Sequence, residues 1–163
     1  MPIIDVTRNS EALALEITLR FDASVERVWR LWEDPRQLER WWGPPTYPAT
    51  VVDHDLRPGG HVNYYMTGPE GDQHKGYWRV REVEPPTRLV FEDGFADDEG
   101  VPNDEMPVTG SEVTIEPAEG SGTTMRIHSR FPSAEAMQQL LDMGMEEGIR
   151  EATSQIDALL AED

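Results

Sequence analysis

The chain has 163 residues, which is long enough for one domain with a substantial hydrophobic core. Its 32 acidic residues outnumber 14 lysines and arginines, and the net charge of -18 without a basic tract excludes a surface that binds nucleic-acid phosphates or anionic membranes. Cysteine is absent, so disulfides, thiolate nucleophiles and cysteine-ligated zinc sites are excluded as well.

Residues 1–12 are expected to form a tail ahead of the first strand. They contain no cationic stretch followed by a long apolar run, so they lack the pattern of a secretory signal. Nowhere in the sequence do about 18 apolar residues follow one another, as a membrane-spanning helix requires. We therefore expect a cytoplasmic protein, without membrane or nucleic-acid partners, whose acidity keeps it dispersed in solution.

Residues 13–21 are predicted to form the first strand, because apolar and polar side chains alternate along them. Two short helices are predicted to follow this strand. The first contains Trp29 and Trp32 at helical spacing and is closed by Pro35, which cannot continue a helix. The second carries two further tryptophans and stops at the Gly-Pro-Pro turn of residues 43–45.

A meander of six strands is predicted next, because short stretches of strand character alternate with turns rich in glycine and proline. In the third of these strands, Val80 and Val83 lie three positions apart, and a bulge would explain the break in the alternation. The acidic stretch 92–105 is interpreted as a solvated, mobile loop, as charge runs usually are. The predicted strands comprise residues 50–56, 61–66, 75–83, 88–93, 112–116 and 123–131.

Residues 133–161 are predicted to form one long C-terminal helix. Ser133 is a suitable N-cap, no proline follows Pro132, and apolar residues recur at spacings of three, four and seven. At 1.5 Å per residue this helix would be about 40 Å long. It is the element large enough to cover the apolar face of the sheet. The predicted fold is therefore α+β, in the order β-α-α-β6-α, with a curved antiparallel sheet wrapped around the C-terminal helix. One domain is expected over residues 1–163, its strands and short helices lying in residues 13–132.

An ordered set of motifs connects this pattern to a known superfamily. The motifs are Trp29-x-x-Trp32 before Trp41-Trp42-Gly43-Pro44, then Asp55-Leu56-Arg57-Pro58-Gly59-Gly60, the segment from Glu82 to Phe91, and Gly144-Met145-Glu146-Glu147-Gly148. Through them, residues 13–160 resemble the START-like (SRPBCC) superfamily, and most closely the bacterial single-domain relatives of the activator of heat-shock-protein-90 ATPase. The resemblance implies the helix-grip fold, with a cavity between sheet and C-terminal helix. It implies no single function, because such proteins include ligand carriers, polyketide cyclases, resistance proteins and stress-related proteins, without a shared catalytic residue set.

The predicted C-terminal helix contains two glycines, Gly144 and Gly148, that point to a close approach. Each costs about 1 kcal/mol relative to alanine inside a helix, and four positions apart they flatten one face. Either a neighbouring element packs there or a ligand lies across the helix. The tryptophans have two interpretations as well, as core filling or as walls of an apolar pocket. The predicted cavity residues are Trp32, Trp42, Tyr64, Trp78, Phe91, Met125, Leu141, Met145 and Gly148.

The sequence contains no motif for a known catalytic site, so no catalytic residue and no cofactor are assigned. Nucleophile elbow, Walker loop, dinucleotide fingerprint and Ser/His/Asp constellation are all missing. No metal site is predicted, because the four histidines are scattered over separate strands. An enzyme of this fold would need a polar group on the inner face of the sheet. The candidates for such a group are His61, Tyr64, Tyr65, Tyr77 and Arg79.

Three functional hypotheses follow. The first is non-covalent binding of a hydrophobic or aromatic small molecule in an internal cavity, without catalysis. The second, from the resemblance alone, is an interaction module that modulates a chaperone ATPase, and it predicts a filled core. The third is a polyketide-cyclase-like enzyme, which requires a buried ionisable group with a displaced pKa in the pocket. A homodimer, formed through an apolar strand edge or the tryptophan-rich surface, is a further expectation.

Overall fold

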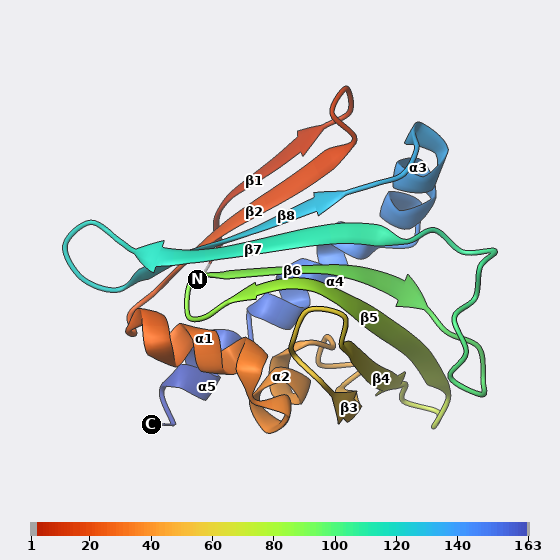
Figure 1. Ribbon diagram of the computed structural model, residues 1–163, viewed down its shortest axis with the longest axis horizontal. Coiled ribbons are helices and arrows are strands. Elements are labelled where there is room, and N and C mark those ends of the chain that lie inside the picture. The colour runs from red at the N-terminus through yellow and green to blue at the C-terminus, as the bar shows by residue number, and fades with distance from the viewer. Residues whose placement is uncertain (1–2, 163) are drawn as a thin grey trace.

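The computed structural model describes residues 3–162, and these residues form an eight-stranded antiparallel sheet. The strands lie in the order β1-β2-β8-β7-β6-β5-β4-β3 (Figure 1). Strands that are neighbours in the sheet are also consecutive in the chain, except that β2 pairs with β8. The sheet therefore consists of the meander β3 to β8 and the hairpin β1–β2, which joins it through the pairing of β2 with β8. The strands are β1 (Ile3–Asn9), β2 (Ala14–Phe21), β3 (Ala49–His54), β4 (His61–Thr67), β5 (Gln73–Glu84), β6 (Arg88–Phe95), β7 (Thr109–Pro117) and β8 (Thr123–Arg130).

Strand β1 corrects the expectation of an N-terminal tail over residues 1–12. Its residues pair with β2 in antiparallel register, and the side chains of Ile3 and Val6 pack against the core. Because the other described side chains of β1 are polar and exposed, the sequence lacks the apolar alternation by which the other strands were found. Met1 and Pro2, and Asp163 at the other end, lie outside the described residues.

The six predicted strands of the meander are confirmed as β3 to β8, with small shifts at their ends. The predicted bulge is present, since the pairing of β5 with β6 shifts register between Val80 and Glu82. Strand β6 extends to Phe95, so the stretch 92–105 is not entirely loop. Its exposed loop is confined to the residues beyond this strand, and Asp93 lies within the sheet.

The two short helices close one end of the sheet. Helix α1 (Val25–Glu33) begins at Ser24, whose side chain accepts a hydrogen bond from the Arg27 backbone N–H, and α2 (Pro35–Trp41) begins with proline after Asp34. Trp32 of α1 is fully buried and its ring meets Trp41 edge to face, with 4.8 Å between the centroids. These helices thus contribute the aromatic part of the core.

The prediction of one long C-terminal helix was wrong, because the chain forms three consecutive helices instead. They are α3 (Ala134–Asp142), α4 (Met145–Thr153) and α5 (Ile156–Leu160). The first break is at Gly144, whose φ of 90° is left-handed and ends α3 in the way glycine commonly ends helices. A two-residue turn at Ser154 and Gln155 separates α4 from α5. The three helices nevertheless follow one path behind the sheet, from α3 near the end of β8 to α5 beside α1 (Figure 1).

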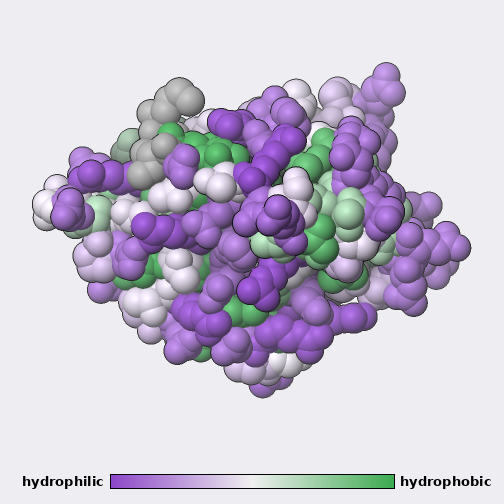
Figure 2. All heavy atoms as spheres, turned by 90° about the horizontal axis from the view of Figure 1, so that it is seen from above, coloured by the Kyte–Doolittle hydropathy of each residue, from purple (hydrophilic) through white to green (hydrophobic). Residues whose placement is uncertain are grey.

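The outer surface carries most of the charge. The face seen from above is mainly hydrophilic, with apolar side chains in small separate groups (Figure 2). No helix within residues 3–162 is long and apolar enough to cross a bilayer. The apolar residues gather between the sheet and the helices in two clusters, a large one around Trp32, Trp78 and Phe91 and a small one around Leu15 and Phe131.

Candidate functional site

A cavity of about 500 Å³ lies between the sheet and helices α3 and α4. Its floor is formed by inward-facing residues of β4, β6, β7 and β8, and its roof by the C-terminal helices. The segment that follows α2 forms a third wall through Trp42, Pro44 and Tyr47. His74 and Met143, which also line the cavity, are exposed to solvent and mark its mouth. The site is therefore an internal space with an opening to solvent.

The roof is formed by one face of α4. Met145, Gly148, Ile149 and Ala152 all line the cavity, and their spacing of three, four and seven places them on the same side of a helix. A Cβ added at Gly148 would have no atom within 4 Å, so this glycine leaves space empty rather than admitting a neighbouring strand. No neighbouring element within the described residues packs against Gly148, so space for a ligand is the interpretation that is left for this glycine.

Contacts at both ends hold α4 in place over the cavity. At its start, Arg8 Nε of β1 donates a 2.7 Å hydrogen bond to Glu146 Oε1, and this contact, together with Arg150, lowers the pKa of Glu146. Beyond its end, Gln155 Nε2 donates to the Gly43 carbonyl oxygen at 2.7 Å. The roof is thus tied to the edge of the sheet and to the loop after α2.

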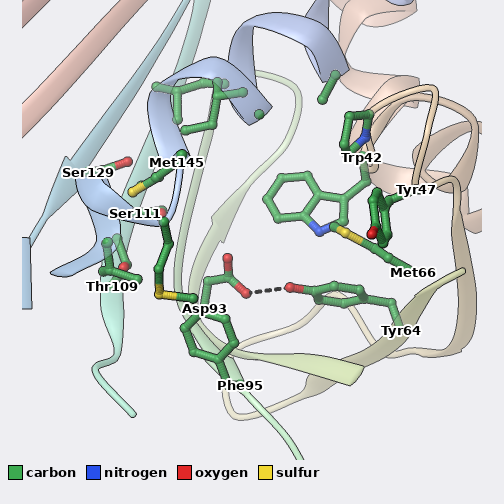
Figure 3. Close-up of a pocket in the computed structure, with 18 of the residues that line it drawn as sticks. Trp42, Tyr47, Tyr64, Met66, Asp93, Phe95, Thr109, Ser111, Ser129 and Met145 are labelled. Carbon is green, nitrogen blue, oxygen red and sulfur yellow. Dashed lines mark hydrogen bonds between the residues drawn. The ribbon is translucent and has the colours of Figure 1, made fainter. Parts of the chain in front are cut away.

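The floor carries a hydrogen-bonded pair of ionisable side chains, Tyr64 on β4 and Asp93 on β6. The Tyr64 hydroxyl donates to Asp93 Oδ1 at 2.9 Å, although β5 lies between the two strands (Figure 3). Gly76 of β5 makes this reach possible, because a Cβ there would lie 2.4 Å from the Tyr64 hydroxyl oxygen. The phenol ring therefore passes over a glycine, an arrangement known to compensate for glycine in sheets.

Removal from water dominates the protonation of this pair. Burial raises the pKa of Asp93 to about 7, while the hydrogen bond from Tyr64 acts in the opposite direction. Burial, and after it the negative charge of Asp93, raises the pKa of Tyr64 well above 10. At neutral pH the tyrosine is thus a neutral donor, and the Asp93 carboxyl is populated in both its protonated and ionised forms.

The second carboxyl oxygen of Asp93 points into the cavity (Figure 3). Within residues 3–162 it accepts no hydrogen bond, and no lysine or arginine lines the cavity. The hydroxyls of Thr109, Ser111 and Ser129, on the adjacent strands β7 and β8, also line the cavity and make no hydrogen bond to the described residues. The floor therefore presents one carboxyl and several hydroxyls in an otherwise apolar space.

The structure brings together part of the predicted cavity set. Trp42, Tyr64, Phe91, Met145 and Gly148 all line the cavity. Tyr64 and Phe91 lie on the inner face of the sheet, Trp42 follows α2, and Met145 and Gly148 lie on the cavity side of α4.

The remaining predicted residues do not line the cavity. Trp32, Trp78 and Met125 are fully buried in the core beside it, where the Trp32 indole N–H donates to the Met125 sulfur at 3.2 Å. Leu141 packs against the smaller cluster around Leu15. These side chains support the cavity walls from behind.

Sequence reasoning placed Asp93 at the end of the predicted strand 88–93 but also counted it in the acidic stretch 92–105, so it was not recognised as a site residue. The alternation of Leu89, Phe91, Asp93 and Phe95 could have placed it inside, since alternate residues of a strand share a face. The four polar candidates other than Tyr64 do not line the cavity. Those residues are His61, Tyr65, Tyr77 and Arg79, and Tyr77 lies over Gly94 with its hydroxyl 2.5 Å from a Cβ built there.

The comparisons with known proteins agree with this architecture. The sequence model of the family described as Activator of Hsp90 ATPase homolog 1-like protein matches residues 22–161. Protein Ms6760 from Mycobacterium smegmatis is 50% identical with a TM-score of 0.90, over 98% of this chain and 97% of that one. A protein from Arthrobacter aurescens, solved by NMR, is 53% identical with a TM-score of 0.93, over 98% and 92%. One from Rhodobacter sphaeroides is 27% identical with a TM-score of 0.83, over 98% and 99%. No curated protein matches the chain.

Proposed function

This chain belongs to the Activator of Hsp90 ATPase homolog 1-like family, with the START-like helix-grip fold, and we propose that it binds a hydrophobic or aromatic small molecule non-covalently. The observation that carries the proposal is the cavity of about 500 Å³ under α4. Ligand sites in proteins typically occupy roughly 300–1,000 Å³ and combine apolar walls with a few polar groups. The Trp42, Phe91 and Phe95 rings and the Asp93 carboxyl fit that description.

The driving force would be the removal of apolar surface from water, by ligand and walls together. An apolar lining of aromatic rings and methionines suits a flat or irregular hydrophobic molecule, because methionine side chains adapt to different shapes. The chaperone-module hypothesis predicts a filled core, so the cavity supports ligand binding over it. The test of that second hypothesis remains stimulation of a chaperone ATPase by the purified protein.

The proposal is tested by filling the cavity from its roof. Gly148→Phe would place a ring in the empty space below α4, whereas Gly148→Ala adds one methyl group and leaves the space open. With the fluorescent probe N-phenyl-1-naphthylamine, we expect saturable binding to the unaltered protein and to Gly148→Ala, and at least a tenfold weaker affinity for Gly148→Phe. Mass spectrometry of the purified protein would complement the titration by detecting a co-purified ligand.

Two results would overturn the proposal. One is the absence of binding by this probe and by a panel of acyl and polyaromatic compounds, with no co-purified molecule. The other is equal affinity of the probe for Gly148→Phe and for the unaltered protein, because binding would then take place elsewhere. Circular dichroism of the variants would establish that the fold is unchanged.

A specific observation favours a second candidate function, proton transfer of the polyketide-cyclase type. Asp93 is the ionisable group in the cavity that such an enzyme requires, and a pKa of about 7 suits a general base at neutral pH. Its carboxylate would take the α-proton of a ketone, with the Tyr64 hydroxyl beside it. In D2O, the protein would then speed deuterium incorporation at the α-carbon of 2-tetralone, and Asp93→Asn would not. Equal rates with both proteins, or none above buffer, would remove this candidate.

A further inference from the structure

The Asp93 carboxylate faces a cavity that, among the described residues, is lined by no lysine or arginine. The Oδ1 of Asp93 is bonded to Tyr64, and its other oxygen faces the cavity. A charged group removed from water normally needs a partner, because desolvation is costly unless an opposite charge or hydrogen bonds replace the lost water. The cavity therefore contains an acceptor that the described part of the protein leaves unmatched.

We propose that the ligand of this cavity is an amphipathic cation, an aromatic or alicyclic body that carries an ammonium group placed against the free oxygen of Asp93. This inference rests on the proposed ligand-binding function and narrows its ligand class.

Three features of the site favour an ammonium group over a neutral or anionic one. An ammonium offers three donors, and the site supplies acceptors for them on one wall, since Thr109 pairs directly with Asp93 across β6 and β7 and Ser111 follows on the same face. An attraction between opposite charges is stronger in a cavity that is poor in water than on the surface. An anionic group would instead face the Asp93 carboxylate with no cation to balance it.

The aromatic side chains around Asp93 suit a cation as well. Trp42, Tyr64 and Phe95 surround the carboxyl (Figure 3), and ring faces attract ammonium groups. The chain as a whole has a net charge of -18, which raises the local concentration of cations and speeds their approach. The apolar body of the ligand would extend from Asp93 toward the α4 roof and the mouth.

Protonation of Asp93 makes the proposed binding dependent on pH. The other titratable groups that line the cavity are Tyr64 on β4, His74 on β5 and Tyr47 in the loop before β3. His74 lies at the mouth, where its Nε2 is 2.7 Å from Asp72 Oδ2, and it does not replace Asp93 as the group on the floor. Affinity for a cation should rise with pH as Asp93 ionises, provided that the ligand itself stays charged.

The test uses three ligands of one shape and different charge: 2-naphthylmethylamine, 2-naphthylmethanol and 2-naphthoate. In calorimetric titrations at pH 8, we expect the amine to bind at least tenfold more tightly than the alcohol, and the carboxylate more weakly than the alcohol. Asp93→Asn should reduce the amine to the affinity of the alcohol. Asp98→Asn changes the net charge equally in the exposed loop and should keep the preference.

The outcomes separate this inference from the proposed function. If amine and alcohol bind equally, or Asp98→Asn loses the preference as Asp93→Asn does, the cation inference is overturned while the binding function stands. If none of the three compounds binds, the cation inference is overturned, and the probe and panel titrations decide separately on the binding function. A pH series on the unaltered protein tests the inference without depending on whether a variant folds. Amine affinity should rise at least fivefold from pH 5.5 to 8 while alcohol affinity stays level, and a level amine affinity would also overturn the inference.

Discussion

Asp93 should make the protein less stable as the pH rises, and Asp93→Asn should remove this effect. The pKa of Asp93 in the folded state is about 7, against 3.8 for an aspartate in water. Because the folded state holds this proton more tightly than the unfolded state, the stability that it contributes is complete below about pH 4 and is lost as the pH rises through 7. At 1.36 kcal/mol per pKa unit, the difference amounts to at most about 4 kcal/mol.

This magnitude is an upper bound, because Asp93 is half-buried and its free oxygen borders an open cavity. About 2 to 3 kcal/mol of this stability should be lost between pH 5 and pH 8.5. Over that range the free energy of unfolding can be measured with urea. The measurement is the free energy of unfolding of both proteins at each pH. The difference between them cancels the titration of the other acidic residues.

We expect the free energy of unfolding of Asp93→Asn to increase relative to that of the unaltered protein as the pH rises, since asparagine fits the same space without a charge. A difference between the two proteins that stays constant from pH 5 to pH 8.5 would refute the reasoning. The carboxyl would then titrate as an ordinary surface group, and the low polarity inferred for the floor of the cavity would be wrong.

Glycine substitutions should separate three different local roles, each measured by urea unfolding at pH 7. Gly76→Ala should cost about 1–3 kcal/mol, because the new methyl group displaces the Tyr64 ring and with it the hydrogen bond to Asp93. Gly144→Ala should cost about 1–2 kcal/mol, since a φ of 90° strains any residue with a Cβ. Gly148→Ala should instead add about 1 kcal/mol, because its backbone is helical and the space beside it is empty. Equal signs at Gly144 and Gly148 would contradict these assignments.

Much of the fold could be predicted because its signals are local. The strands of the meander alternate, their turns contain glycine and proline, and the bulge near Val80 breaks the alternation where the pairing shifts. The edge strand β1 was not predictable in this way, because beyond Ile3 and Val6, which contact the core, its other described side chains are polar and exposed. An edge strand depends on hydrogen bonds to its neighbour, which a sequence pattern does not contain.

The C-terminal helices show a different limit. The apolar spacing is continuous through residues 133–161 and by itself describes one helix. Whether Gly144 lies inside a helix or ends one depends on its φ, and the sequence is compatible with both. The left-handed conformation at Gly144 lets α4 begin anew, so that Met145 and Gly148 face the cavity. Both residues line the cavity, although the helix that carries them is not continuous with α3.

The position of Asp93 argues for a role beyond folding. A carboxyl with its pKa raised to about 7 lowers stability at neutral pH, and neither the bulge nor the turns of the sheet require it there. Gly76 of β5 leaves the space through which the Tyr64 phenol reaches the carboxyl of Asp93. A group that costs stability and is kept in a cavity with its second oxygen free is the pattern expected where binding or chemistry uses the charge.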